Sequence, residues 1–440
     1  MIRLVELDQA RQTILLRSRS GRLSFPEGLT ADVELLFGPG ATPESAVSQI
    51  LDSVRREGDS ALHHWTRVLD RTELEDFAVP QKVLDVAAEA LAPELANALD
   101  LAIERIRDFH ERQPLPDWQT DALGGTVGQR VTAIERVGVY VPGGSAPLPS
   151  SLLMSVIPAQ VAGVAEIALC TPPQPDPVIL AAAKRCGVSE LYQVGGAQAV
   201  AAMAFGTESI RPVDKIVGAG NLFVTLAKQQ VYGIVGLDGL AGPTETMVIA
   251  DGEADPAWVA ADLLAQAEHN VLASAILLTT SRPLAEAVQR AVAIQLEDLS
   301  RTEIIVQSLA HRGGIVVVPD LETAAALANA YAPEHLCLAV RQPAELLPRL
   351  AHAGGIFMDE HSFEVLGDYV AGPSHIMPTG GSARFASPLN VLDFVKITSI
   401  IGLDPATSSA LSETAALLAE AERLTAHAAA AQARREASVE

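Results

Sequence analysis

The stretch Arg136-Val137-Gly138-Val139-Tyr140-Val141, followed by Pro142-Gly143-Gly144-Ser145-Ala146-Pro147, decides the fold. Its first half is an apolar run typical of a buried strand, and its second half is rich in residues that end strands and form turns. Downstream, helical patterns alternate with further strand-like runs at 166–170, 190–194 and 215–217. Strands that alternate with helices form right-handed βαβ units, so we expect a parallel sheet in residues 139–245.

A second series of strand-like runs begins after Ala241-Gly242-Pro243-Thr244-Glu245. The runs predict strands at 246–250, 273–279, 314–318, 336–340 and 355–358, with a helix at 256–268 between the first two. We therefore expect an α/β fold with two Rossmann-like doubly wound parallel-sheet domains, one inserted in the other.

The two ends of the chain differ from these blocks. Residues 1–28 predict a short N-terminal arm, and helical patterns at 43–65 and 81–112 are expected to complete the larger domain. Asp404-Pro405 is a good N-cap and first-turn proline for an Ala/Leu/Glu-rich terminal helix. The predicted units are the arm 1–28, a larger domain of 29–138 plus 246–384, an inserted NAD-binding-like domain 139–245, and a C-terminal helical segment 385–440.

The composition narrows the class of protein. With 440 residues, 49% apolar and 4% aromatic, the chain fits a packed, helix-rich α/β enzyme. A formal net charge of −23 argues against nucleic acid or an anionic membrane as a partner. Cys170, Cys186 and Cys337 form no metal or redox motif, and the N-terminus does not resemble a signal peptide, so we expect a cytoplasmic protein. The apolar run at 152–170 contains Gln160, Pro158 and Glu166, which favours a buried helix and strand over a membrane span.

The segment Ala332-Pro333-Glu334-His335-Leu336 places a carboxylate beside an imidazole. General acid–base catalysis at neutral pH needs such groups, because their pKa values can be moved toward 7. Glu334 and His335 are therefore candidate catalytic residues. The alternative is that they form a surface Glu-His pair at an element boundary.

Two glycine-rich turns follow predicted strands of the inserted domain. They are Gly195-Gly196-Ala197-Gln198 and Gly218-Ala219-Gly220-Asn221. Glycines here would let the backbone approach a pyrophosphate at a helix N-terminus, although Phe223 replaces the third glycine of the dinucleotide fingerprint. Plain tight turns are the alternative, but turns at the ends of neighbouring parallel strands favour a nucleotide cleft.

Several further polar groups stand at sites where a ligand could bind. In Gln266-Ala267-Glu268-His269, the two outer side chains share a helical face and could hold a metal or polar ligand, or His269 could simply face solvent. The segment Gly367-Asp368-Tyr369 opens a glycine-rich loop that ends at His375. Glu422 and His427 lie on a solvated helix face or reach a partner subunit.

Taken in order, these blocks resemble the histidinol dehydrogenase family. The resemblance extends from Val54-Arg55-Arg56-Glu57-Gly58-Asp59 to Leu424-Thr425-Ala426-His427 and is most specific at Ala241-Gly242-Pro243-Thr244-Glu245. It implies an intertwined homodimer that contains one zinc ion per subunit. It also implies oxidation of L-histidinol to L-histidine through L-histidinaldehyde, with two NAD, as the final steps of histidine biosynthesis.

The resemblance also assigns roles to matching positions. It implies that Glu334 and His335 are the catalytic pair. Zinc ligands are implied at Gln266, His269, Asp368 and His427, and NAD contacts at Tyr140, Gln198 and Asn221. Substrate contacts are implied at Thr244, Gln266, His269, His335, Asp368, Glu422 and His427, with the last two contributed by the neighbouring subunit.

These roles lead to a mechanistic hypothesis. His335 takes the hydroxyl proton while hydride leaves, and Glu334 then takes a proton from the water that attacks the aldehyde. A zinc hydrolase is the main alternative, although the chain has no HExxH motif. A catalytically silent relative is disfavoured, because every matched catalytic and zinc position retains usable chemistry. An enzyme of other amino alcohols or sulfonates is a further alternative within the same family.

Overall fold

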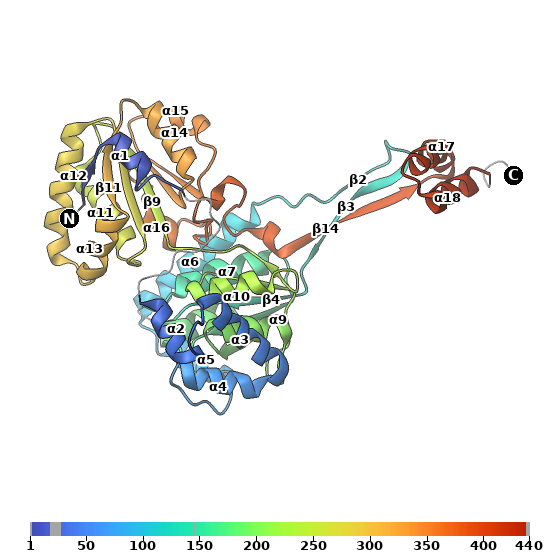
Figure 1. Ribbon diagram of the computed structural model, residues 1–440, viewed down its shortest axis with the longest axis horizontal. Coiled ribbons are helices and arrows are strands. Elements are labelled where there is room, and N and C mark those ends of the chain that lie inside the picture. The colour runs from blue at the N-terminus through green and yellow to red at the C-terminus, as the bar shows by residue number, and fades with distance from the viewer. Residues whose placement is uncertain (1, 18–27, 144–145, 437–440) are drawn as a thin grey trace.

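The computed structural model describes residues 2–17, 28–143 and 146–436. Figure 1 shows two α/β bodies and a long projection that ends in two helices. Gly144 and Ser145 of the loop that follows the first predicted strand, residues 18–27 of the expected arm, and residues 437–440 lie outside the described residues.

The larger body is built on a six-stranded parallel sheet in the order β1-β11-β10-β9-β12-β13. Its strands are β1 (Leu4–Val5), β9 (Glu245–Ala250), β10 (Ser274–Thr279), β11 (Gly314–Val317), β12 (His335–Ala339) and β13 (Gly355–Met358). One face packs against α11 (Pro256–Ala267), α12 (Arg282–Gln295) and α13 (Thr302–His311), and the other against α1 (Leu7–Gln12), α14 (Leu321–Tyr331) and α15 (Pro343–Leu346). Because both faces are covered, the central strands are apolar along nearly their whole length.

The smaller body has a five-stranded parallel sheet in the order β6-β5-β4-β7-β8. Its strands are β4 (Arg136–Tyr140), β5 (Glu166–Thr171), β6 (Glu190–Gln193), β7 (Lys215–Val217) and β8 (Gly236–Leu237). One face packs against α3 (Pro43–Glu57), α4 (Asp59–Leu69), α9 (Gly196–Phe205) and α10 (Leu222–Val231), and the other against α5 (Gln81–Glu89), α6 (Pro93–Glu111), α7 (Pro149–Val161) and α8 (Pro177–Arg185). The two parallel doubly wound sheets confirm the predicted fold class.

Two sequence-based expectations about the N-terminal region need correction. Leu4–Val5 pairs with β11 and is an edge strand of the larger sheet, so the expected arm is partly built into that domain. The helices from α3 to α6 were expected to complete the larger domain, but they cover the smaller sheet, with Ile50 and Val54 in one core with Val200. An amphipathic pattern shows that a helix buries one face, but it does not show which sheet receives that face.

The projection contains an antiparallel sheet and a helical tip. Its strands are β2 (Trp118–Thr120), β3 (Gly125–Ala133) and β14 (Val395–Leu403), and its tip is formed by α17 (Pro405–Ala421) and α18 (Thr425–Glu436). The segment after residue 385 was expected to be helical, so β14 is a correction. The expected single terminal helix is two helices, because Arg423 adopts a left-handed backbone (φ 61°) that ends α17.

The remaining elements are short connections. They are α2 (Leu29–Phe37), α16 (Glu364–Tyr369) and 3₁₀ turns at Leu296–Asp298, Leu347–Arg349, Ser382–Arg384 and Val391–Phe394. Among the described helices, none combines the length and the apolar character needed to cross a lipid bilayer.

Candidate active site

Glu334 and His335 lie at the amino-terminal edge of the larger sheet. Helix α14 ends at Tyr331 and is followed by Ala332, whose backbone is left-handed (φ 54°), and β12 begins at His335, one residue earlier than expected. Strand β12 is hydrogen-bonded to β9, which follows Thr244 directly. The two segments that carry the candidate chemistry therefore start side by side, although ligands of open α/β sheets usually bind at the carboxyl ends of strands.

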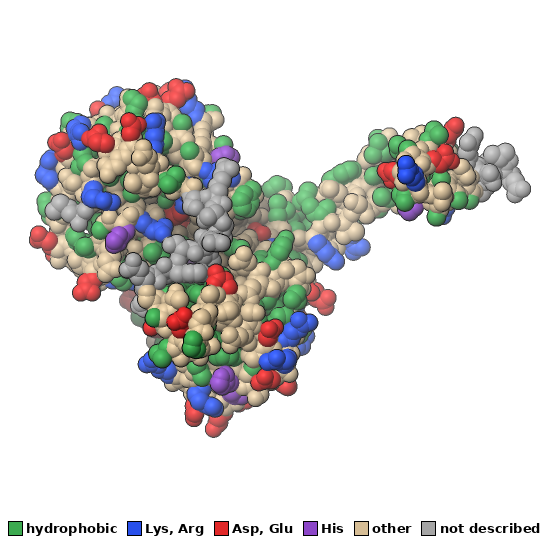
Figure 2. Space-filling model, in the orientation of Figure 1, with side chains coloured by type: hydrophobic (Ala, Val, Ile, Leu, Met, Phe, Trp, Pro, Cys, Tyr) green, Lys and Arg blue, Asp and Glu red, His purple; other side chains and the backbone are tan. Residues whose placement is uncertain are grey.

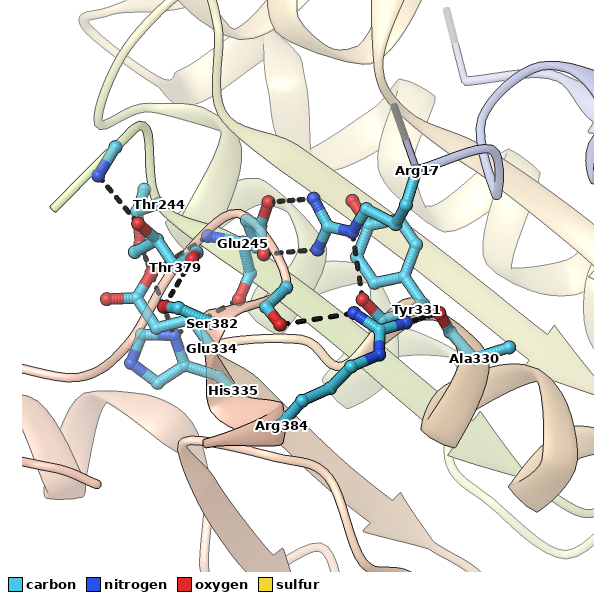
Figure 3. Close-up of polar contacts among 12 residues, drawn as sticks. Arg17, Thr244, Glu245, Ala330, Tyr331, Glu334, His335, Thr379, Ser382 and Arg384 are labelled. Atoms are coloured by element: carbon cyan, nitrogen blue, oxygen red, sulfur yellow. Dashed lines mark hydrogen bonds and ion pairs between the residues drawn. The ribbon is translucent and has the colours of Figure 1, made fainter. Parts of the chain in front are cut away.

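The carboxyl group of Glu334 is held by two donors from the start of β9. The Thr244 hydroxyl donates to Oε2 at 2.6 Å, and the backbone N–H of Glu245 donates to the same oxygen at 3.0 Å (Figure 3). The residue is 7% exposed. Burial raises the pKa of Glu334 to about 7, while His335 and the two donors lower it in part. The group can therefore gain and lose a proton near neutral pH.

The imidazole of His335 is oriented by a backbone carbonyl. Its Nδ1 lies 3.2 Å from the Glu245 carbonyl oxygen, which can only accept, so Nδ1 carries the hydrogen and, in the neutral ring, Nε2 has the lone pair. Nε2 is buried and has no hydrogen-bond partner among the described residues. The residue is 3% exposed, which excludes the surface Glu-His pair considered above. The unpaired Nε2 is a group that can accept a proton.

Three of the predicted metal-ligating residues lie beside this couple. Gln266 is fully buried in the last turn of α11, and in either orientation its amide contacts Thr244 on one side and Glu364 on the other. Asp368, on α16, has Oδ1 at 3.8 Å from Nε2 of His335. His269 follows the end of α11. Burial lowers the pKa of its imidazole, the charge of Asp368 raises this pKa and the charge of His335 lowers it, so the three side chains lie close enough to interact electrostatically.

The donor set suits a metal ion with nitrogen and oxygen ligands. One amide, one imidazole and one carboxylate come from a single chain, and zinc accepts imidazole nitrogen and carboxylate oxygen. Burial lowers the pKa of His269 and so favours the neutral imidazole, which is the form that binds metals. In the described part of the chain, no three His, Cys, Asp or Glu side chains are grouped to hold a metal ion. By their chemistry, the three donors of the described chain therefore fit zinc.

Glu364 is a site residue that the sequence reasoning missed. It is 1% exposed, accepts a hydrogen bond from the Thr246 hydroxyl and has Oε1 at 4.0 Å from Nδ1 of His335. Burial, with Asp368 nearby, raises the pKa of Glu364 well above its usual range, which favours the neutral carboxyl. Its spacing of four residues from Asp368 on a helix was the signal that could have found it.

The predicted NAD contacts lie at the carboxyl-terminal edge of the smaller sheet. Tyr140 ends β4, and its hydroxyl accepts a hydrogen bond from the Gly196 N–H at 3.1 Å. Gln198, 1% exposed, donates to Asp70 at 3.1 Å, while its Oε1 is buried without a partner in the described structure. Asn221 caps α10 by accepting from the Val224 N–H. The unpaired buried oxygen of Gln198 is an acceptor that a nucleotide could use.

The turn before Asn221 is shaped for close backbone approach. Gly218 has φ 107°, and a Cβ atom there would lie 2.2 Å from the Tyr140 carbonyl oxygen. Lys228 bonds the Gly218 carbonyl at 2.9 Å and pairs with Asp238, which also accepts from the Gly218 N–H. With N-termini of α9 and α10 at this edge, the arrangement fits the phosphates of a dinucleotide.

Glu422 and His427 are not near the other site residues within one chain. Glu422 ends α17 and His427 lies in the first turn of α18, at the distal end of the projection (Figure 1). Both are exposed. The structure brings together Thr244, Gln266, His269, Glu334, His335 and Asp368 but leaves these two outside.

Two doubly wound sheets and a buried carboxyl–imidazole couple define a two-domain α/β protein whose buried groups are suited to acid–base chemistry. A profile of the histidinol dehydrogenase family matches residues 40–435. The histidinol dehydrogenase of Deinococcus radiodurans is 49% identical over 419 residues, which cover 94% of this chain and 95% of that protein. The Thermus thermophilus histidinol dehydrogenase is 50% identical over 394 residues, covering 90% and 94%.

A solved structure agrees with these sequence matches. The histidinol dehydrogenase of Elizabethkingia anophelis superposes with a TM-score of 0.91 at 34% identity and covers 100% of this chain and 99% of its own. The chain belongs to the histidinol dehydrogenase family.

Proposed function

We propose that the enzyme oxidises L-histidinol to L-histidine through L-histidinaldehyde, with two NAD, in the last steps of histidine biosynthesis. The observation that carries the proposal is the buried couple, in which His335 offers an unpaired Nε2 and Glu334 has a pKa of about 7. Membership of the family supplies the substrate, and the couple supplies chemistry suited to two successive proton removals.

The first oxidation uses His335 as the base. Its Nδ1–H is fixed by the Glu245 carbonyl, so Nε2 faces the substrate side with its lone pair. Nε2 takes the proton of the substrate hydroxyl while the carbinol carbon loses hydride to the co-substrate NAD, which gives the aldehyde. The nearby carboxylate of Asp368, 3.8 Å away, stabilises the imidazolium that forms.

The second oxidation uses Glu334 as the base. Its carboxylate takes a proton from the water molecule that attacks the aldehyde carbon, which gives the hydrated aldehyde as an oxyanion. That oxyanion then passes its hydride to the second co-substrate NAD and becomes the carboxylic acid. The Thr244 hydroxyl and the Glu245 N–H hold the carboxylate in place and favour its charged form. The protein environment excludes bulk water, since both bases are buried.

We propose that zinc is held by Gln266, His269 and Asp368 together with His427 of the partner subunit. When bound, zinc would act as a template that fixes the amine and imidazole of histidinol. Glu422 of the partner subunit would contact the substrate. The exposure of α17 and α18 on the projection supports a homodimer in which each tip reaches the other chain.

Tyr140, Gln198 and Asn221 are proposed to contact NAD.

The described cysteines support a cytoplasmic setting. All three cysteines are buried with free thiols. Burial raises the pKa of Cys170 and of Cys186 to about 12, so neither is a reactive thiolate at neutral pH.

The proposed function is tested by counting NADH formed per histidinol. We expect two NADH and one histidine per histidinol, and loss of activity after chelation that added zinc restores. His269→Asn should lose bound zinc while remaining folded, because it removes one of three donors from its own chain. One zinc per subunit in that variant, or a stoichiometry of one NADH with no histidine, would contradict the proposal.

A further inference from the structure

Arg17 reaches the site from the N-terminal segment, 228 positions before its partner Glu245. Its two terminal nitrogens bond both carboxylate oxygens of Glu245 (Figure 3). Its Nε donates to the carbonyl oxygen of Tyr331 at 2.8 Å, and its guanidinium carbon lies 3.5 Å from the centroid of the Tyr331 ring. The guanidinium is therefore fixed by three kinds of contact to two separate segments.

The bonds of Arg17 to Glu245 and Tyr331 form a clamp, and Glu245 connects this clamp to both candidate bases. Its backbone N–H donates to Oε2 of Glu334, and its carbonyl accepts from Nδ1 of His335. The two peptide units that flank one residue therefore orient the whole acid–base couple. Glu245 is 4% exposed, so its carboxylate depends on Arg17 as a partner for its charge.

Tyr331 connects the same guanidinium to the other side of the couple. It is the last residue of α14, and Glu334 follows three positions later through the left-handed Ala332. Arg17 thus joins the start of β9 to the end of α14. Glu334 and His335 are hydrogen-bonded to the first of these segments and follow the second in the chain. A shift of either segment would change the distances at Glu334 and His335 together.

We infer that Arg17 is a positioning residue for Glu334 and His335, acting through the Glu245 carboxylate and the end of α14. The inference rests on the roles proposed above for the couple. A guanidinium is required because its planar fork bonds both carboxylate oxygens while Nε bonds a third acceptor, which an ammonium group cannot reproduce.

Arg11 provides a matched control from the same segment. It is half exposed, and its one described ion pair is a 3.5 Å contact to the exposed Asp8. Exposed pairs of this kind contribute little to stability. Arg11→Met removes the same charge from the N-terminal segment without touching β9 or α14.

The test compares Arg17→Met, Arg17→Lys, Arg11→Met and Glu334→Gln as purified, zinc-loaded enzymes, at a temperature below the melting point of each. We expect Arg17→Met to lower kcat by about 10–100-fold, because a displacement of catalytic groups by about 1 Å can cost about 100-fold. KM for histidinol should stay within about threefold and zinc content should not change, since the contacts of Arg17 described above go to Glu245 and Tyr331 and not to a proposed zinc ligand. Arg17→Lys should recover part of kcat, and Arg11→Met should match the unsubstituted enzyme.

A double variant tests the route through Glu245. If Arg17 acts by holding that carboxylate, then Arg17→Met should cost much less in an enzyme that already carries Glu245→Gln. An equal fold-loss in both backgrounds would overturn the inference. The double variant also carries no unpaired buried charge, so it remains measurable where Arg17→Met alone fails to fold.

The remaining outcomes separate this inference from the proposed function. A kcat of Arg17→Met within twofold of the unsubstituted enzyme, with Glu334→Gln strongly impaired, would overturn the inference and leave the proposed catalytic roles standing. Full activity of Glu334→Gln would overturn both. A fall in melting temperature of Arg17→Met without a fall in kcat would show a purely stabilising residue and would also contradict the inference.

Discussion

The buried half of the proposed site and the tip of the projection differ in the exposure of their polar side chains. Glu334 and His335 are 7% and 3% exposed, and each is oriented by hydrogen bonds from its own chain. Glu422 and His427 are exposed on helices that protrude from both bodies. One chain therefore orders its acid–base groups by itself, whereas the residue proposed as the fourth zinc ligand lies on its surface, where the proposed partner subunit would use it.

Apolar exposure follows the same division. Figure 2 shows hydrophobic side chains along the projection, and Ile401, Leu417 and Leu418 are 77%, 62% and 62% exposed. A stalk with so much uncovered apolar surface is unfavourable in water for a single chain. An intertwined dimer would cover that surface and deliver the two exposed polar residues at the same time.

The largest expected effect is on the buried half. Glu334→Gln should slow oxidation of added histidinaldehyde by about 10²–10⁴-fold, because it removes the base that activates water. The conversion of histidinol to the aldehyde should be affected less, since His335 is retained. Single-turnover formation of NADH from each substrate measures both steps. Full-rate oxidation of the aldehyde by this variant would refute the role of Glu334, and the exposed Glu322→Gln serves as the control.

The second effect is a pH-dependent gain in stability from the same change. Burial raises the pKa of Glu334 from 4.5 to about 7, so the folded protein prefers the neutral carboxyl. Below pH 4.5 the carboxyl is neutral in both the folded and the unfolded protein, so it does not lower the free energy of unfolding. As the pH rises from 4.5 to 7 it lowers the free energy of unfolding progressively, and above pH 7 the loss is constant at about 3 kcal/mol. Glu334→Gln should therefore melt at a higher temperature at about pH 8, with nearly no difference at about pH 4.5. If Glu334→Gln and the unsubstituted enzyme melted at the same temperature as each other at both pH values, the carboxyl would not be desolvated.

The smallest effect concerns the exposed half. Leu418→Ala should weaken dimerisation by about 1.5–3 kcal/mol if the side chain becomes fully buried between subunits. Sedimentation at several concentrations measures the dissociation constant. Ile294→Ala, which removes a 69% exposed side chain from α12 on the larger body, is the matched control and should have no effect. An unchanged constant for Leu418→Ala would place the interface elsewhere.

The central strands could be predicted from sequence because their chemistry is local. Strands β9, β10 and β12 are buried on both faces, so they stand out as apolar runs between turn residues, and their observed bounds differ by only one residue from the expected ones. The couple at Glu334 and His335 also stood out, because two ionisable groups follow a helix-ending proline. Each of these signals lies within a few consecutive residues.

The remainder depended on contacts between distant segments. Strand β14 was missed because its partner β3 lies more than 260 positions earlier and neither strand has a fully buried face. Arg17 was missed because a single arginine in a terminal segment carries no pattern, and its importance appears only once Glu245 and Tyr331 are placed beside it. The association of α3 with the smaller sheet was missed for the same reason.

The most direct test of a site shared between two chains is complementation between inactive subunits. Glu334→Gln and His427→Asn each inactivate a homodimer in this account, one through the buried half and the other through the projection. A mixed dimer then contains one site with both halves intact, so random mixing of unfolded and refolded subunits should restore about one quarter of the original activity. No recovery, with mixed dimers shown to form, would mean that His427 serves its own chain and would contradict the shared site.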